Sequence, residues 1–164
     1  MTREFTKQEK IAWLAAQPKK PLSSKLLVWD ERRELLVIKP NYKKHWDIPG
    51  GMVEAWESPL EGAIREIKEE LGLVIAPEAL QFAGVRYGTS KVSQGDFLHF
   101  LFHTSITKPA RDALQIDESE IEAYRWLPQE QAVAMLAGNH LRQFIAKVLQ
   151  SQQPRYADGD DRLL

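Results

Sequence analysis

The sequence predicts a mixed α+β fold built from β-hairpins and helices. Short apolar runs between turn residues predict strands, and stretches with capping signals and helical spacing predict helices. These elements do not alternate as regular strand–helix–strand units, which argues against a doubly wound sheet. The 164 residues, 43% of them hydrophobic, suffice for one domain with a sizeable core. We expect that domain at residues 1–150 and a polar, flexible tail at residues 151–164.

The N-terminal segment predicts a short helix. Residues 6–16 carry apolar side chains at helical spacing, with Ile11, Leu14 and Ala15 on the inward face. Pro18 ends this helix, because proline cannot continue the helical hydrogen bonding.

Apolar runs bounded by polar turns predict the strands. Residues 30–33 form the turn of a first hairpin, and residues 88–95 form a polar turn between two later strands. Pro128 stands at the start of the first C-terminal helix. The expected strands are residues 25–29, 34–38, 80–87, 97–104 and 120–127, and after a connector at 108–115 the expected C-terminal helices are residues 129–136 and 139–150.

The clearest element is a helix over residues 59–71. Ser58 and Glu61 form a capping box, in which each side chain can accept a hydrogen bond from the other residue's backbone amide. Pro59 is favourable at the first helical position, and Gly72 suits the left-handed conformation that ends a helix. The expected buried stripe is Ile64, Ile67 and Leu71.

Three carboxylates, those of Glu66, Glu69 and Glu70, share one face of this helix, because their spacings are three and four residues. Like charges repel, so a bound cation explains them most simply, and oxygen ligands favour Mg²⁺ or a similar ion. Arg65 lies four residues before Glu69 and can hold that carboxylate in place. A solvated acidic helix is the competing interpretation.

A tight turn precedes the helix. Residues 46–48 read as a short apolar strand that ends at Pro49-Gly50-Gly51, where glycine permits positive φ angles. Such a turn can aim a backbone carbonyl at a metal ion or let the backbone approach a phosphate. Together with Glu57 in the following loop, the turn and the acidic helix predict a metal site on rigid elements.

The segment from residue 51 to residue 73 resembles the Nudix box, whose pattern is G-x5-E-x7-R-E-U-x-E-E-x-G-U with U an aliphatic residue. Every fixed position is filled, and the box spans 23 of the 164 residues. The residues at these positions are Gly51, Glu57, Arg65, Glu66, Ile67, Glu69, Glu70, Gly72 and Leu73.

The resemblance implies an α/β/α sandwich around a central mixed sheet. It also implies hydrolysis of a nucleoside diphosphate linked to another group, with Mg²⁺ or Mn²⁺ as the cofactor. Arg65 would orient the carboxylates, and Glu57 would support the box or reach the metal through water. The implied metal ligands are Glu66, Glu69, Glu70 and the carbonyl of Gly50.

The implied chemistry is attack by water on phosphorus, which a general base can assist. The family takes this base from the box, where Glu69 and Glu66 are candidates, or from a loop outside it. Glu120 stands at the start of a predicted strand, where related proteins often carry a metal-reaching carboxylate, and we favour it over Glu118. A solvated acidic turn explains this segment equally well.

Candidate substrate-binding residues flank the box. Lys39 and Lys43 lie upstream of the glycine turn and could meet substrate phosphates, although solvated lysines are commoner in such loops. Tyr42 and Tyr87 are candidates to stack on a base. Trp46 shares an apolar face with Ile48, so we expect Trp46 in the core.

Two histidines, His99 and His103, share one face of a predicted strand. Residues four apart in a strand are separated by about 13 Å, which is too far to bind one metal ion together. We therefore expect both to line a pocket or the surface.

Composition narrows the classes of function. The net charge of −1 gives no sign of nucleic-acid binding, and the lack of cysteine excludes thiolate metal sites, disulfides and thiol catalysis. We find no signal-peptide core and no run near the roughly 20 apolar residues that a membrane span needs. A cytoplasmic protein with a small nucleotide-type substrate and no membrane contact is expected, and a homodimer is an open option.

The substrate stays open between related phosphoanhydrides. A nucleoside triphosphate or a dinucleoside polyphosphate is favoured over ADP-ribose or a nucleotide sugar. The resemblance links ADP-ribose cleavage to a proline beyond the box, and residues 86–89 contain none, whereas Tyr87 lies near a position linked to dinucleoside polyphosphates. A nucleotide-binding module without catalysis is the other alternative, although such modules generally lack box carboxylates. An isopentenyl diphosphate isomerase shares the fold but depends on a cysteine, which this chain lacks.

Overall fold

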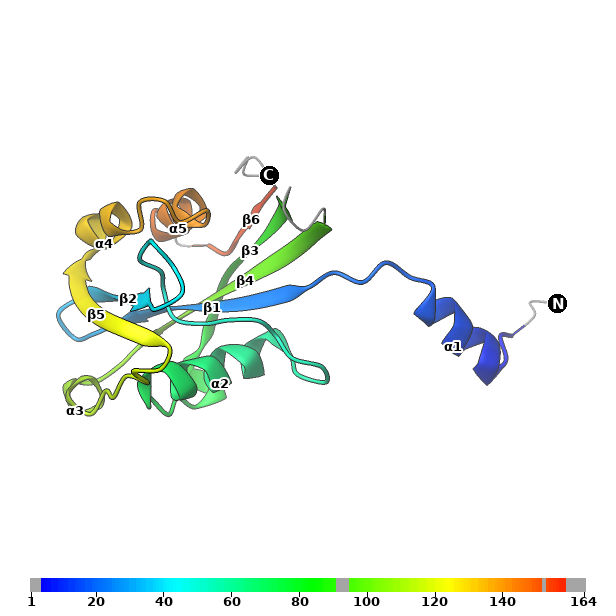
Figure 1. Cartoon of the computed structure of the whole chain (residues 1–164), viewed down its shortest axis with the longest axis horizontal. Coiled ribbons are helices and arrows are strands. Elements are labelled where there is room, and N and C mark those ends of the chain that lie inside the picture. Colours follow the sequence, from blue (N-terminus) through cyan, green and yellow to red (C-terminus); the bar gives the residue numbers. More distant parts are fainter. Residues whose placement is uncertain (1–3, 91–94, 152, 159–164) are drawn as a thin grey trace.

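A central sheet separates two groups of helices (Figure 1). The computed structural model describes residues 4–90, 95–151 and 153–158. Helices α2 and α3 lie on one face of the sheet, and α4 and α5 lie on the other (Figure 1). The elements are α1 Lys7–Ala15, β1 Leu22–Trp29, β2 Glu34–Pro40, α2 Pro59–Leu71, the 3-10 turn Pro77–Ala79, β3 Gln81–Ser90, β4 Gly95–Ser105, α3 Lys108–Asp112, β5 Ile121–Pro128, α4 Gln129–Met135, α5 Arg142–Leu149 and β6 Arg155–Ala157.

The sheet is mixed, with six strands in the order β5-β2-β1-β4-β3-β6. Strands β1 and β4 are parallel, as are β3 and β6, and the other neighbouring pairs are antiparallel. The predicted α+β class and the implied α/β/α sandwich are therefore confirmed. The parallel register places Ser23 of β1 beside His99 of β4, which matters for the site described below.

Two apolar clusters fill the spaces between the sheet and its helices. Leu26 and Val28 of β1 belong to the cluster on the α2 side, whereas Leu27 between them belongs to the cluster on the α5 side. This alternation follows from the pleat of a strand, which sends successive side chains to opposite faces. Each such burial stabilises the fold by about 1.5–3 kcal/mol. Trp46, which we expected in the core, is partly buried against the α5-side cluster.

Helix α2 has the predicted bounds and caps. The amide of Glu61 donates to Ser58 Oγ over 3.2 Å, and the amide of Ser58 donates to Glu61 Oε2 over 2.8 Å. Gly72 has a φ of 67° in the left-handed region, as its position predicts. Ile67 and Leu71 are fully buried, and the third residue of the expected stripe is partly buried against the same cluster.

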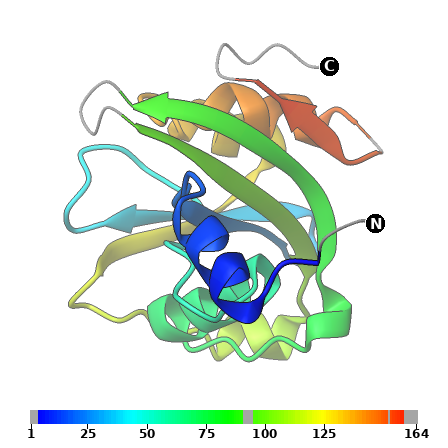
Figure 2. The same cartoon turned by 90° about the vertical axis from the view of Figure 1, so that its right-hand side faces the viewer.

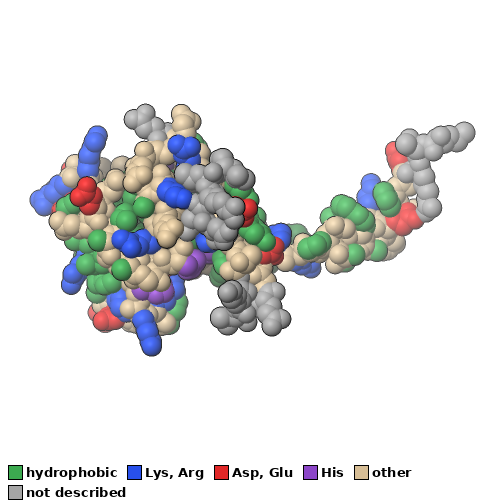
Figure 3. Space-filling model, turned by 90° about the horizontal axis from the view of Figure 1, so that it is seen from above, with side chains coloured by type: hydrophobic (Ala, Val, Ile, Leu, Met, Phe, Trp, Pro, Cys, Tyr) green, Lys and Arg blue, Asp and Glu red, His purple; other side chains and the backbone are tan. Residues whose placement is uncertain are grey.

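Helix α1 forms where the sequence predicts it, but the prediction that its apolar residues face inward is wrong. Ile11 and Leu14 are 50% and 60% exposed, and no residue of α1 is buried. Figure 3 shows the helix on an arm that projects from the body of the molecule. Apolar side chains occur on more than one side of this helix, with Trp13 about half a turn from Ile11, so it lacks a single stripe for docking.

Several other elements differ from the predictions. Strand pairing between β3 and β4 continues to Ser90 opposite Gly95, so these strands extend into the predicted turn, whose residues 91–94 lie outside the described part. Helix α3 occupies the start of the predicted connector. The predicted strand at residues 46–48 is replaced by a single bridge between Asp47 and Ile38.

One segment of the predicted tail forms a strand. Strand β6 pairs with β3 in parallel, and Figure 2 shows it beside that strand at the edge of the sheet. Ala157 is fully buried, so this short segment packs against the body of the molecule. Residue 152 and residues 159–164 lie outside the described residues. Within the part that the structure describes, no helix is long and apolar enough to cross a membrane.

Candidate active site

The acidic face of α2, the glycine turn and three loops line one pocket of about 570 Å³. Strands β1 and β4 form part of its wall, and the loops before β5 and between α4 and α5 complete it. The predicted site residues that line it are Tyr42, Lys43, Gly50, Arg65, Glu66, Glu69 and Glu120. The predicted site residues outside its lining are Lys39, Glu57, Glu70 and Tyr87.

Arg65 organises the carboxylates of α2. One terminal nitrogen donates to Glu66 Oε1 over 2.9 Å and to Glu69 Oε2 over 2.8 Å, so the predicted contact between Arg65 and Glu69 is confirmed. Its Nε and other terminal nitrogen donate to the two oxygens of Glu57 over 2.9 and 3.1 Å, and that terminal nitrogen also donates to the carbonyl of Met52 over 2.9 Å. The hydrogen bond from Arg65 lowers the pKa of Glu57. Glu57 therefore holds Arg65, which in turn holds the other two carboxylates.

Glu70 is bound to the glycine turn. The amide of Gly50 donates to Glu70 Oε2 over 2.8 Å, and Glu70 is only 3% exposed. Burial raises the pKa of Glu70 to about 7, and the charges of Glu66 and Asp47 act in the same direction. Lys25 and the amide of Gly50 oppose this rise without cancelling it.

The two glycines of the turn make room for different neighbours. Gly50 has a φ of 120°, and a Cβ there would lie 2.2 Å from the carbonyl oxygen of Ser24. A Cβ on Gly51 would lie 2.4–2.7 Å from the carboxylate atoms of Glu66. Gly50 therefore allows the turn to pack on β1, and Gly51 allows Glu66 to approach the turn.

The donor set fits a hard divalent cation. The three carboxylates of α2 and the carbonyl of Gly50 are oxygen donors on neighbouring rigid elements. Burial also raises the pKa of Glu66, because removal from water disfavours its charged form. Among the described residues, no three His, Asp or Glu side chains form a ready metal site, since Arg65 and the amide of Gly50 hold the carboxylates.

Lys25 is a site residue that the sequence reasoning missed. It lies on β1 at 7% exposure, and its ammonium donates to the carbonyls of Gly50 and Ile48 and to Asp47 Oδ2. The distance to Asp47 is 3.1 Å. The available signal was a lysine within an otherwise apolar buried strand, a position that charged residues occupy only when they are paired.

Asp47 links the glycine turn to two loops. Its carboxylate contacts Lys25 and Lys43, and accepts a hydrogen bond of 2.7 Å from Asn139 Nδ2. Burial would raise the pKa of Asp47, but the two lysines outweigh burial and lower it. Asn139 Oδ1 in turn accepts from the amide of Leu141 over 2.8 Å, which fixes the loop between α4 and α5.

Histidines also line the pocket. His99 lies on β4, as expected for a pocket-lining residue, and its Nδ1 contacts Ser23 Oγ. Its Nε2 lies 3.3 Å from Nε2 of His140, which comes from the loop before α5. Neither Ser23 nor His140 was predicted, because their approach depends on strand register and on the path of a distant loop.

Of the remaining predicted site residues, some reach the pocket and others lie outside its lining. Glu120 and Tyr42 reach the pocket, and Tyr42 is 69% exposed with the ammonium of Lys43 5.4 Å from its ring centre. Lys39 Nζ donates to the carbonyl of Lys43 over 2.6 Å. Tyr87 lies on β3, where its hydroxyl donates to Asp96 Oδ2 over 3.0 Å.

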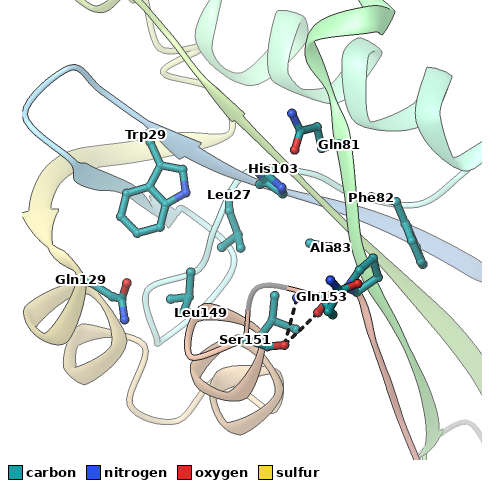
Figure 4. Close-up of a pocket in the computed structure, with 12 residues that line it drawn as sticks. Leu27, Trp29, Gln81, Phe82, Ala83, His103, Gln129, Leu149, Ser151 and Gln153 are labelled. Carbon is teal, nitrogen blue, oxygen red and sulfur yellow. Dashed lines mark hydrogen bonds between the residues drawn. The ribbon is translucent and has the colours of Figure 1, made fainter.

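A second cavity of about 340 Å³ lies at the other end of β1, among β3, β4, α5 and the start of α4 (Figure 4). Trp29, Phe82 and His103 contribute rings to its wall, and Gln81 and Gln129 contribute amides. The described residues that line it include no carboxylate and none of the predicted site residues. His103 thus lines a pocket, as expected, but a different one from His99.

Comparison with known proteins places the chain in a family. The sequence profile of the NUDIX domain matches residues 19–148. Nudix hydrolase 2 of Arabidopsis thaliana is 32% identical over 111 residues, which cover 65% of this chain and 38% of that protein. The chain spans little more than a third of the length of the first curated plant relatives.

Solved structures share the fold. The NUDIX domain of Shewanella oneidensis NrtR in complex with ADP ribose has a TM-score of 0.69 at 18% identity and covers 89% of this chain and 98% of its own. A Caenorhabditis elegans Ap4A hydrolase in a binary complex has a TM-score of 0.59 at 19% identity and covers 78% and 96%. The fold, the complete box and the profile match agree, so this chain belongs to the Nudix family.

Proposed function

We propose that this chain hydrolyses a phosphoanhydride bond in a nucleotide-type substrate, with Mg²⁺ or Mn²⁺ as its cofactor and residues 1–150 as one catalytic domain. The observation that carries the proposal is the cluster of Arg65 with three carboxylates beside the glycine turn. A merely solvated acidic helix would not hold a buried Glu70 against the amide of Gly50. The retained box carboxylates argue against a silent binding module.

The residues of the site have different proposed roles. Glu66, Glu69, Glu70 and the carbonyl of Gly50 would hold the cation. When bound, the cation neutralises phosphate charge and lowers the pKa of water. Glu120 would accept a proton from the attacking water, a role supported by its position in the lining of the same pocket, whereas Glu118 is not among the described residues of that lining.

Two of the solved neighbours support a nucleotide-type substrate. One solved neighbour holds ADP ribose and another is an Ap4A hydrolase. For this chain we propose a nucleoside triphosphate or a dinucleoside polyphosphate, with ADP-ribose as the alternative. Tyr42 and Lys43 line the pocket and would contact the substrate, while Lys39 and Tyr87 make their contacts outside its lining.

A substrate screen tests this proposal. The full chain is incubated with ATP, GTP, Ap4A and ADP-ribose in Mg²⁺ or Mn²⁺, and the products are identified. Reaction in ¹⁸O-labelled water locates the attacked phosphorus from the labelled product. Metal-dependent cleavage of one of these phosphoanhydrides supports the function. Tight nucleotide binding without turnover of any of them would instead favour the silent binding module.

Stability should fall with rising pH when no metal is present. Between about pH 5 and 7 the folded protein keeps a proton on Glu70, whose pKa is raised from 4.5 to about 7, and the unfolded chain releases it. The proton stabilises the folded state at low pH, and about 3 kcal/mol of this stabilisation is lost as pH rises through 7. The lowered pKa of Asp47 acts only at more acidic pH.

Mg²⁺ should restore the folding stability that is lost as the pH rises. At pH 8 we expect millimolar Mg²⁺ to raise the melting temperature by on the order of 5–10 °C, and at pH 5.5 by much less, because a protonated Glu70 binds cations poorly. Thermal melts with EDTA or Mg²⁺ at both pH values measure the difference. Glu70→Gln serves as the control, since it removes the titrating group. Equal melting temperatures in all four conditions would refute the site.

A further inference from the structure

Ser23, His99 and His140 form a continuous row of contacts in the wall of the pocket. Ser23 Oγ contacts Nδ1 of His99, and Nε2 of His99 lies 3.3 Å from Nε2 of His140. All three residues line the pocket that also contains Glu66 and Glu69. Histidine atoms reach the surface of the body in the space-filling view (Figure 3).

The surroundings fix the geometry of the row. The parallel pairing of β1 with β4 holds Ser23 beside His99. The ring of Phe97 packs edge-on against both imidazoles, with centroid distances of 4.6 Å to His99 and 6.4 Å to His140. The hydrogen bond from the amide of Leu141 to Asn139 holds the loop that carries His140.

Both imidazoles are neutral at neutral pH. Burial lowers the pKa of His99 to about 3, and the positive charges of Arg86 and Lys25 act in the same direction. Burial, followed by the charge of Arg86, also lowers the pKa of His140, although Asp47 opposes the shift. Each ring therefore carries one N–H, and each contact in the row holds one proton.

The hydrogen bonds of the row can be arranged in only two ways, which differ in the direction of donation. In the first, Ser23 donates to His99, His99 Nε2–H donates to His140, and Nδ1–H of His140 is left to donate outward. In the second, His140 donates to His99, His99 Nδ1–H donates to Ser23, and the hydroxyl of Ser23 donates outward. One end of the row is then always a donor and the other an acceptor, and the ends exchange when the protons shift together.

We propose that this row recognises the base of the nucleotide, a planar nitrogen heterocycle that is joined to the phosphates through the sugar. The inference rests on the proposed function. A neutral hydrogen-bonding wall suits a heterocycle edge, whereas a further phosphate would require cations. Lys25 and Lys43 already contact Asp47, and Arg86 is buried and is not among the described residues of the lining. Tyr42 and Met52 line the same pocket and are more than half exposed, which leaves surfaces for a ring to stack on.

The two proton directions have a consequence for specificity. An amino group on the heterocycle donates a hydrogen bond, so it pairs with the row when the facing end of the row is an acceptor. An oxo group at the same place accepts a hydrogen bond, so it pairs when that end is a donor. The row therefore accepts both kinds of purine. We expect kcat/KM for ATP and GTP to agree within about tenfold, because neither base leaves a buried polar group unpaired.

Kinetics separate recognition of the base from catalysis. His140→Phe keeps an aromatic ring but removes the nitrogens, so the ratio of kcat/KM for ATP to that for inorganic tripolyphosphate should fall about tenfold. The matched control is His103→Phe, which lies in the other cavity and should leave the ratio unchanged. A ratio unchanged by His140→Phe would overturn the proposal, whether or not the overall rate falls.

A binding measurement keeps the test independent of turnover. Nitrogen-15 spectra of the imidazoles at pH 7 are recorded with AMP, which has a 6-amino group, and with IMP, which has a 6-oxo group. The two nucleotides should move the His99 and His140 nitrogens in opposite directions, with His45 and His103 as internal references. Such shifts without any hydrolysis would support recognition of the base and would refute only the proposed hydrolytic function. Unmoved or fully protonated imidazoles would refute recognition.

Discussion

Glu69→Gln should lower kcat by on the order of 10²- to 10³-fold while the protein stays folded. The change removes a negative charge that the cation needs and keeps the size of the side chain, and a cation's contribution to such a transition state is several kcal/mol. Glu69 is more than half exposed and contacts Arg65, which keeps Glu57 and Glu66 as partners. Folding therefore does not depend on its charge.

Steady-state kinetics and a thermal melt measure the two effects separately. The matched control is Glu61→Gln on the same helix, because glutamine at that position can still complete the capping box with Ser58. This control should keep both the rate and the melting temperature. If Glu69→Gln kept more than half of the wild-type kcat with a tight metal site, Glu69 would not be a ligand in the reaction.

The parts of the site that sequence could predict are those set by local interactions. The capping box, the proline at the first turn and the glycine stop of α2 all act within four residues, so the bounds of this helix and the contact of Arg65 with Glu69 follow from spacing alone. The same holds for the turn at Gly50, whose positive φ only glycine adopts readily.

The parts that sequence could not predict depend on contacts between distant segments. Lys25 reaches the carbonyl of Gly50 only because β1 packs under the turn, and His140 meets His99 across 41 positions of sequence. The burial of β6 similarly depends on pairing with β3. The apolar spacing in α1 led to the wrong prediction that this helix packs against the core. The helix forms through its own capping box of Thr6 and Glu9 and needs no docking surface.

Gly50→Ala should destabilise the fold severely, by about 4 kcal/mol or more. The new Cβ would lie 2.2 Å from the carbonyl oxygen of Ser24 and 2.9 Å from Cα of Lys25, and these backbone atoms belong to the central strand and cannot move aside. A φ of 120° adds strain for any residue with a Cβ. Costs of this size are exceptional and arise from such backbone conflicts.

Urea denaturation measures the loss, and two other glycines separate its causes. Gly138→Ala also has a positive φ, of 89°, but its Cβ would meet nothing closer than His45 Cβ at 3.5 Å, so it should cost only about 1–2 kcal/mol. In Gly51→Ala the nearest atoms to the new Cβ are those of the Glu66 carboxylate, a flexible side chain that can move, so this change should weaken Mg²⁺ binding with little loss of stability. Equal losses for Gly50→Ala and Gly138→Ala would mean that strain alone, and not the close packing of the turn on β1, keeps glycine at the site.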